Sequence, residues 1–226
     1  MNDTLLLALA LIPALVIAIV FHEVSHGWVA LALGDPTAKE RRRLTFNPIR
    51  HVDPIGTIIL PGFLALVGAP VFGWAKPVPV DQRRLNNPRF GMMAVAIAGP
   101  AMNLLLATVG AVVLGLIARA YPIGATPPEL LLTGFAYFIA INIFLALFNL
   151  IPLPPFDGSH IVEGLLPDRA ARAYARLRPF GFPLLIVLLI VIPSLFPQLG
   201  IVERFVLPPV DWLQERFFGL ANSIAG

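Results

Sequence analysis

The sequence predicts an all-α polytopic membrane protein with about four to six transmembrane helices and a re-entrant loop or β-hairpin between the first two core helices. Two observations lead to this prediction. The 226 residues are 58% hydrophobic and only 13% charged, which is more apolar surface than a soluble domain can bury, and several uncharged runs are long enough to span a bilayer. We expect a single membrane-embedded domain over residues 1–226, with its catalytic core at about 4–164 and C-terminal helices at about 180–226.

The first element is the apolar run Thr4–Leu33, which we expect to be a helix. Its 30 residues would extend about 45 Å, which exceeds a hydrocarbon core of about 30 Å. The helix must therefore tilt, kink at Pro13 or protrude. No basic residue precedes this run, and it is much longer than the core of a signal peptide, so we expect the helix to be retained.

A basic connection follows, and after it comes a second apolar stretch, Ile55–Trp74, which is poor material for a straight helix. Proline breaks a helix and glycine weakens it. These two residue types recur at positions 56, 61, 62, 68, 70 and 73. We therefore expect this stretch to enter the membrane and leave it on the same side, as a re-entrant loop or hairpin.

The distribution of basic residues tests this expectation independently, because Lys and Arg concentrate in cytoplasmic loops. If Ile55–Trp74 re-enters, three connections share one side of the membrane and carry 13 of the 16 basic residues, and the opposite side has only Arg119. If the stretch spans instead, six basic residues lie on one side and eight on the other. The re-entrant topology agrees with the rule. The 13 residues are Lys39, Arg41, Arg42, Arg43, Arg50, Lys76, Arg83, Arg84, Arg89, Arg169, Arg172, Arg176 and Arg178.

The next segment, Phe72–Val80, has proline at positions 77 and 79. In an extended strand these prolines remove the N–H donors from one edge, whereas Lys76, Val78 and Val80 keep theirs on the other edge. Such a strand can pair on one edge only. A linker in polyproline conformation is an equal alternative.

Three further spans are expected downstream. Met92–Ala118 contains small residues that allow another helix to approach closely, and Pro100 is expected to kink it. Leu130–Leu153 ends in a proline-rich turn, and a shorter span follows at Phe180–Phe196. The tail, Gly200–Gly226, mixes charged with aromatic residues, which favours an amphipathic helix at the membrane interface.

Ionisable side chains near the end of the first run indicate a metal site. In a helix, His22 and His26 lie one turn apart on one face, where two imidazoles can hold one Zn²⁺ while Glu23 lies beside the metal as a base. An ionisable group at the middle of a bilayer costs roughly 2.5–3.5 kcal/mol, so three such groups close together need a function. The alternative is a chance histidine pair that hydrogen bonds satisfy in a packed helix.

Asp157 is the natural third ligand. A hydrolytic zinc site normally has three protein ligands, and because the chain has no cysteine, histidine and carboxylate must supply them. Asp157 follows a proline-rich turn, so by itself it is equally an aspartate of that turn. The re-entrant topology places Asp157 on the same side of the membrane as the two histidines, and the spanning topology places it on the opposite side.

Three motifs together resemble the site-2 protease family of intramembrane zinc metalloproteases. Phe21-His-Glu-Val-Ser-His-Gly27 resembles the family's metal helix, and Gly99-Pro-Ala-Met-Asn103 resembles its Gly-Pro-x-x-Asn element. Residues 149–158, Asn-Leu-Ile-Pro-Leu-Pro-Pro-Phe-Asp-Gly, resemble its second metal motif. The three motifs follow one another in the family's order, which makes the resemblance far more specific than one motif would.

The resemblance implies the roles of individual residues. One Zn²⁺ per chain would be held by His22, His26 and Asp157. Glu23 would be the general base, and Asn149 and Asn103 would assist at the substrate. The chain has no room for inserted PDZ or CBS domains, so the resemblance is to a minimal member of the family.

The implied function is hydrolysis of peptide bonds in or near transmembrane segments of membrane-protein substrates, as in regulated intramembrane proteolysis. The expected location is a bacterial-type inner (cell) membrane, with a multi-pass chain and the active site toward the cytoplasm. The expected partners are the substrate and the lipid bilayer, but no nucleic acid, because the basic residues report on topology. Whether the chain forms a homo-oligomer stays open. We also hypothesise that the donor edge at Lys76, Val78 and Val80 adds an unwound substrate as a strand.

Two other classes of protein remain as alternatives. An ion or solute transport protein with a buried His, Glu and Asp pathway would explain the charged groups, but not their metal-ligand spacing. An inactive substrate-binding relative would lack a ligand or the base, and this sequence lacks neither.

Overall fold

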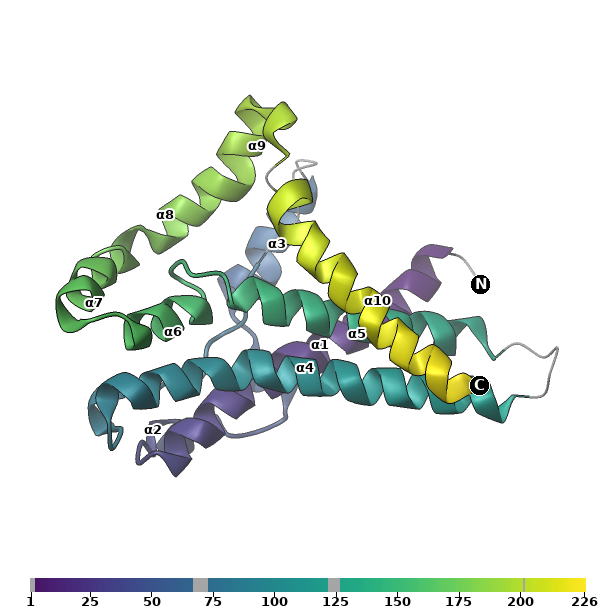
Figure 1. Ribbon diagram of the computed structural model, residues 1–226, viewed down its shortest axis with the longest axis horizontal. Helices are drawn as coiled ribbons and strands as arrows, with labels where there is room; N and C mark the ends of the chain where they lie inside the picture. Colours follow the sequence, from purple (N-terminus) through teal and green to yellow (C-terminus); the bar gives the residue numbers. More distant parts are fainter. Residues whose placement is uncertain (1–2, 67–72, 122–126, 201) are drawn as a thin grey trace.

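The computed structural model describes residues 3–66, 73–121, 127–200 and 202–226, and this part of the chain is folded into helices and loops with no β-strand. The predicted all-α class is confirmed, and Figure 1 shows how the helices are arranged. The α-helices are α1 (Asp3–Ala32), α2 (Thr37–Glu40), α3 (Leu60–Leu66), α4 (Pro88–Ala120), α5 (Glu129–Asn149), α6 (Asp157–Leu165), α7 (Asp168–Ala175), α8 (Gly181–Ile186), α9 (Ile192–Leu195) and α10 (Leu207–Ala225).

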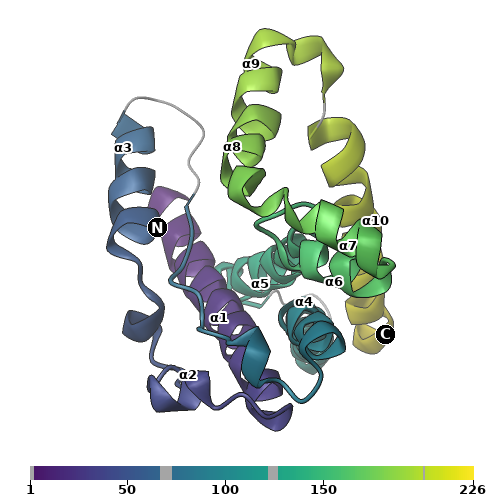
Figure 2. The ribbon, with the colours of Figure 1, turned by 90° about the vertical axis from the view of Figure 1, so that its left-hand side faces the viewer.

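Within the described residues, three helices are long and apolar enough to cross a membrane: α1, α4 and α5. They correspond to the first three predicted spans and contact one another pairwise (Figures 1 and 2). The predicted fourth span, Phe180–Phe196, forms α8 and α9, which are joined by the π-helical turn Val187–Val191. Because a helix of about 15 residues extends only about 22 Å, this segment is shorter than a hydrocarbon core of about 30 Å.

Small residues allow the core helices to approach one another. Ala18 of α1 and Ala96, Ala107 and Ala111 of α4 are completely buried. At Gly115 of α4, an added Cβ would lie 2.5 Å from a backbone oxygen of α10, so only glycine fits there. The predicted role of small residues in close helix packing is therefore confirmed for α4.

The C-terminal helix α10 packs along α4 and α5 (Figure 1). Val210 and Ala221 of α10 are buried in one apolar cluster with Ile139 and Ile143 of α5. α10 begins at Leu207 with prolines in its first turn, where a missing N–H costs nothing. The tail was expected at the membrane interface, but instead one face of α10 belongs to the helix bundle.

The chain between α2 and α4 leaves the bundle and returns to it. Residues 54–66 are helical, residues 67–72 lie outside the described part of the chain, and residues 73–80 are extended. Lys76 N–H donates to the His51 carbonyl at 2.9 Å, and Trp74 N–H donates to the Gly56 carbonyl at 3.1 Å. The two ends of the stretch therefore meet, as a re-entrant topology requires and a spanning one does not allow. The alternative prediction of a β-hairpin is not confirmed, because the described residues contain no β-strands.

Polar contacts join the connections that flank this stretch. Asp35 is completely buried and accepts hydrogen bonds from the backbone N–H groups of Thr37 at 3.0 Å and Asp81 at 2.7 Å. Burial would raise the pKa of Asp35, but these hydrogen bonds outweigh it and lower the pKa. Arg84 forms a bidentate pair with Glu40 at 2.7 and 2.8 Å. The loops after α1 and before α4 thus lie at the same end of the bundle.

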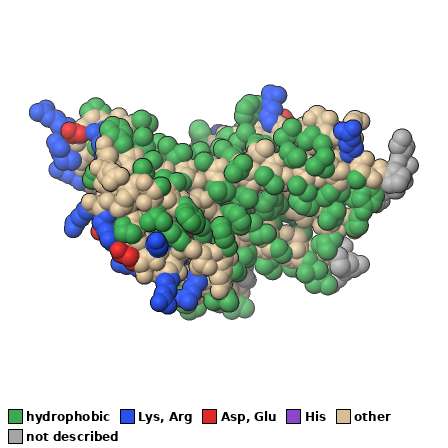
Figure 3. All heavy atoms as spheres, turned by 90° about the horizontal axis from the view of Figure 1, so that it is seen from below, with side chains coloured by type: hydrophobic (Ala, Val, Ile, Leu, Met, Phe, Trp, Pro, Cys, Tyr) green, Lys and Arg blue, Asp and Glu red, His purple; other side chains and the backbone are tan. Residues whose placement is uncertain are grey.

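Ion pairs bring the third basic connection to this end as well. Arg89, at the start of α4, pairs with Asp168 of α7 at 2.6 Å, and Arg178 pairs with Glu163 of α6. On the face seen in Figure 3, most Lys and Arg side chains gather at one end, and hydrophobic side chains cover much of the remaining surface. This separation agrees with the uneven charge distribution that the re-entrant topology predicts.

Candidate metal centre

Two buried histidines project from one face of α1. Because α1 is a regular helix here, His22 and His26 lie one turn apart, with relative exposures of 7% and 9%. Their Nε2 atoms are 3.0 Å apart, and the two rings meet edge to face. The helical spacing read from the sequence therefore brings both imidazoles to one point.

The hydrogen-bond partner of Nδ1 determines which nitrogen of each imidazole carries the proton. His22 Nδ1 is 2.6 Å from Asn103 Oδ1, and His26 Nδ1 is 2.7 Å from the Val95 carbonyl oxygen. The Asn103 amide is oriented by its nitrogen, which donates to the Ala18 carbonyl at 3.1 Å and to Asn142 Oδ1 at 2.9 Å. Both Nδ1 atoms thus face acceptors and carry the hydrogen, which leaves the Nε2 lone pairs free.

Asp157 brings a third potential ligand atom to the same point. It is the first residue of α6, directly after the proline-rich turn, and its Oδ2 lies 3.2 Å from His22 Nε2 and 3.3 Å from His26 Nε2. The next residue, Gly158, is packed so tightly that an added Cβ would lie 2.3 Å from the Leu150 carbonyl oxygen. A larger residue at 158 would displace the turn that places Asp157 against α1.

These three atoms fit a zinc ion. Asp157 Oδ2 is buried without a hydrogen-bond donor among the described residues, and both Nε2 atoms present lone pairs to it, so the arrangement calls for a cation. Zinc bonds of 2.0–2.1 Å at tetrahedral angles put ligand atoms about 3.3 Å apart, close to the observed 3.0–3.3 Å. In the described part of the chain, His22, His26 and Asp157 form the group that could hold a metal.

A glycine on α4 leaves space at the centre. A Cβ added to Gly99 would lie 2.5 Å from His22 Cε1 and 2.5 Å from His26 Nε2. No side chain can occupy this position without moving the imidazoles. Gly99 therefore keeps open the space in which the three ligand atoms meet.

Glu23 lies beside this group, where its carboxylate accepts a hydrogen bond from outside α1. Val78 N–H donates to Glu23 Oε2 at 2.7 Å. The hypothesis of a free donor edge at residues 76, 78 and 80 is therefore wrong for two of the three donors, because Lys76 N–H also bonds the His51 carbonyl. The extended segment is instead attached to Glu23.

The two predicted asparagines, Asn103 and Asn149, have different surroundings. Asn103 is completely buried and contacts His22, so its side chain orients that imidazole, and its predicted role at the substrate stays a prediction. Asn149 is partly exposed near the C-terminal end of α5 and donates to the Leu145 carbonyl at 2.9 Å. Its role at the substrate stays a prediction.

Sequence reasoning gave no functional role to Asn142 and Val95. Asn142 is completely buried on α5 and donates to the Phe138 carbonyl, so its own Oδ1 is directed at Asn103. Val95 acts only through its carbonyl, which no side-chain pattern reveals. A buried asparagine in an apolar helix is the one signal that could have indicated Asn142.

Two other histidines lie outside the group. His51 is buried, and its Nε2 is 2.8 Å from the Thr45 carbonyl oxygen, so it fixes a loop. His160 lies on α6, one turn beyond Asp157. Burial lowers the pKa of His160, and the nearby Arg178 charge lowers it further, so this imidazole is neutral at pH 7.

Comparison with known proteins gives the family. The family described as "Peptidase family M50" matches residues 115–192, a range that contains Asp157 but not the two histidines. The chain is 41% identical over 198 residues to the Bacillus subtilis protein named "Putative zinc metalloprotease YwhC", and this match covers 84% of the chain and 86% of that relative.

Two mycobacterial relatives are more distant. The proteins named "Putative zinc metalloprotease Rip2" are 31% identical over 176 residues in Mycolicibacterium smegmatis and 28% identical over 178 residues in Mycobacterium tuberculosis H37Rv. The matches cover 77% and 76% of this chain, which spans 63% of each of these relatives. No solved structure matches the chain. Because 41% identity extends over most of both this chain and its Bacillus relative, the chain belongs to peptidase family M50, the site-2 protease family.

Proposed function

We propose that this chain is an intramembrane zinc metalloprotease that hydrolyses peptide bonds in or near transmembrane segments of membrane proteins. The observation that carries the proposal is the convergence of His22, His26 and Asp157 on one point within a bundle of membrane-length helices. The names of the relatives support both the metal and the reaction. A transport protein would need ionisable groups, but it would not need three lone pairs at zinc-ligand distances.

The residues divide into ligands, a base and positioning groups. His22, His26 and Asp157 would hold one zinc, which when bound acidifies water and polarises a peptide carbonyl. Glu23 takes a proton from the attacking water and passes it to the leaving amine. The Val78 N–H holds Glu23 Oε2 at 2.7 Å and leaves Oε1 available for the proton. Asn103 keeps His22 in the tautomer that presents Nε2.

Cleavage of a defined substrate tests this function. Purified protein in lipid vesicles is mixed with a protein that has one transmembrane helix, and the cut positions are mapped by mass spectrometry. We expect cuts in or near the apolar segment, which stop when a chelator removes zinc and resume when zinc is restored. Zinc-loaded, folded protein that cuts no such substrate, or cuts only distant soluble loops, would contradict the proposal.

Val78→Pro should reduce cleavage at least about tenfold while zinc content stays at the wild-type level. Proline removes the N–H that fixes the Glu23 carboxylate, so the base loses its orientation but the ligands do not change. Val78→Thr is the matched control, because it keeps the backbone donor and the branched shape. Equal rates for the proline and threonine variants would show that this hydrogen bond does not position the base.

We also propose that the metal centre lies toward the cytoplasm, because the basic connections are at the same end of the bundle as Asp157 and positive charge favours the cytoplasmic side. The chain has no cysteine, so single exposed cysteines can report the side of the membrane. Arg83→Cys and Arg172→Cys should react with an impermeant reagent from the cytoplasmic side, and Arg119→Cys should react from outside. The reverse pattern would invert the orientation, and labelling of positions 83 and 172 from opposite sides would contradict the topology.

A further inference from the structure

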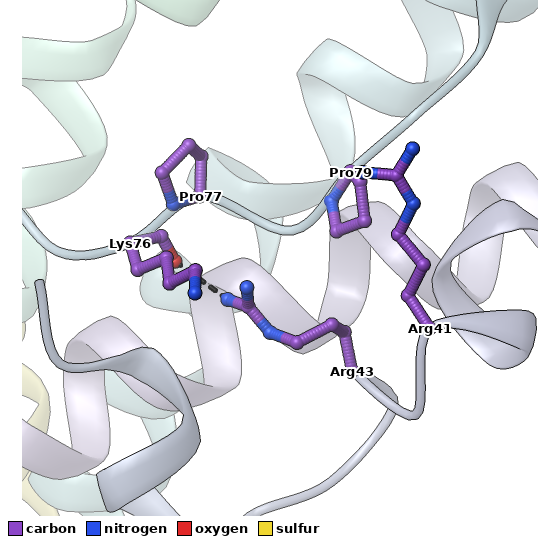
Figure 4. Close-up of a pocket in the computed structure, with 5 residues that line it drawn as sticks. All are labelled: Arg41, Arg43, Lys76, Pro77 and Pro79. Carbon is purple, nitrogen blue, oxygen red and sulfur yellow. Dashed lines mark hydrogen bonds between the residues drawn. The ribbon is translucent and has the colours of Figure 1, made fainter.

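A cavity lined by three cationic side chains lies at the cytoplasmic end of α1 as oriented above. Its volume is about 490 Å³, which is in the range of small-molecule sites. Arg41 and Arg43 come from the loop after α2, and Lys76, Pro77 and Pro79 come from the extended segment, as Figure 4 shows. No carboxylate lines the cavity. A ligand of negative charge is the complement of this lining.

Arg43 makes this cavity a prepared site. Its side chain is only 8% exposed, and one Nη donates to the Lys76 carbonyl at 2.8 Å, which joins the two walls of the cavity (Figure 4). Its Nε is buried and has no hydrogen-bond partner among the described residues. Burial lowers the pKa of Arg43, but a guanidinium stays cationic at physiological pH. The Nε atom is shielded from the cavity as well as from water, so Arg43 contributes its charge: a cation held largely out of water is stabilised by an anion close by.

The three cations also differ from those basic residues of this end that form ion pairs. Arg84, Arg89 and Arg178 have carboxylate partners in Glu40, Asp168 and Glu163. Within the described part of the chain, no ion pair involves Arg41, Arg43 or Lys76. The charge of these three side chains is therefore not taken up by an ion pair and is available to a ligand, and Arg43 in addition joins the two walls through its hydrogen bond to the Lys76 carbonyl.

The surroundings indicate a lipid. Only the short helix α2 and its preceding turn separate Arg41 from the end of α1, a membrane-length helix. Phe46 follows Arg43 by three residues, is 55% exposed, and packs on Phe21 of α1 with ring centroids 4.6 Å apart. Ile49 in the same loop is 77% exposed. Basic groups beside exposed apolar side chains at a membrane boundary match a phospholipid, which has a phosphate next to acyl chains.

We propose that the cationic lining supplied by Arg41, Arg43 and Lys76 binds the head group of an anionic phospholipid at the membrane surface. The same extended segment carries Val78, the residue that bonds Glu23, so a bound head group fixes the backbone that orients the base. This second consequence depends on the proposed protease function, but lipid binding itself does not. An acidic peptide is the competing occupant, but its binding would not explain the exposed apolar side chains of Phe46 and Ile49 beside the cavity.

The test measures lipid binding directly. Protein in detergent is titrated with phosphatidylglycerol, phosphatidylcholine or inorganic phosphate, and bound molecules are counted by native mass spectrometry. The double variant Arg41→Gln/Lys76→Gln keeps the structural Arg43, and a triple variant adds Arg43→Gln. The matched control, Arg83→Gln/Arg172→Gln, removes the same charge from exposed positions outside the cavity. For the binding measurement, every protein also carries Glu23→Gln, so that binding is measured without proteolysis.

We expect phosphatidylglycerol to bind the protein and the control equally, and to bind the double variant at least about tenfold more weakly. In active protein, vesicles with phosphatidylglycerol should support faster cleavage than vesicles of phosphatidylcholine alone, and the double variant should lose that advantage. Equal lipid affinity for the double variant and the control would overturn the proposal. So would inorganic phosphate that binds as tightly as the lipid.

Discussion

Glu23→Gln should abolish cleavage while leaving zinc bound. We expect the rate to fall by about 10²–10⁴-fold, the usual contribution of a positioned acid or base. Glutamine can still accept the hydrogen bond from Val78 N–H through its amide oxygen, so the local structure should persist. It cannot take a proton from water. The rate is measured on a single-span substrate and zinc is measured by elemental analysis of the same samples.

Glu163→Gln is a matched control for this experiment, because Glu163 is an acid on α6 that pairs with Arg178 and does not contact the ligands. It should cleave at nearly the wild-type rate. Loss of stoichiometric zinc from Glu23→Gln would mean that Glu23 is a ligand. Retained cleavage would mean that another group serves as the base.

Gly99→Ala should reduce zinc affinity almost as severely as the loss of a ligand in Asp157→Ala. The new methyl group would lie 2.5 Å from atoms of both imidazoles, so at least one ring must leave its position. Changes around metal ligands weaken binding by about 10–100-fold, and we expect both variants to reach the upper end of this range. Competition with a chelator of known affinity measures the effect.

Gly134→Ala is the control for a glycine-to-alanine change in a membrane helix. An added Cβ at Gly134 of α5 meets no atom within 4 Å, so zinc affinity should be unchanged. Circular dichroism establishes that each variant is folded. Full zinc affinity in folded Gly99→Ala would show that the imidazoles do not meet at this point in the membrane.

The sequence was sufficient to predict that His22, His26 and Asp157 lie at the same end of the bundle, because helix periodicity and charge distribution are enough for that. A helix places His22 and His26 one turn apart whatever surrounds it, and charge counting alone placed Asp157 at the same end of the bundle. Small residues of α4 predicted close packing for the same reason: a glycine or alanine removes a barrier to approach wherever it occurs. These inferences need no knowledge of how two helices are aligned.

Other contacts depend on the alignment of distant segments and could not be predicted. Asn103 meets His22 and Asn142 only because α1, α4 and α5 have one particular register, and a buried asparagine can serve many partners. The Val78 N–H appeared free because strand geometry describes only its own segment, whereas its acceptor, Glu23, is on α1. Likewise, the sequence predicted an amphipathic helix in the tail but could not show that the apolar face of α10 packs on α4 and α5 and not on lipid.

The central claim is that His22, His26 and Asp157 meet at one zinc ion, and zinc K-edge X-ray absorption of the purified wild-type protein tests it most directly. The protein should bind about one zinc per chain, with only nitrogen and oxygen neighbours at about 2.0–2.1 Å and with the outer scattering of two imidazoles. A protein that stays free of zinc after loading, or zinc whose spectrum lacks the scattering of imidazole, would contradict the account.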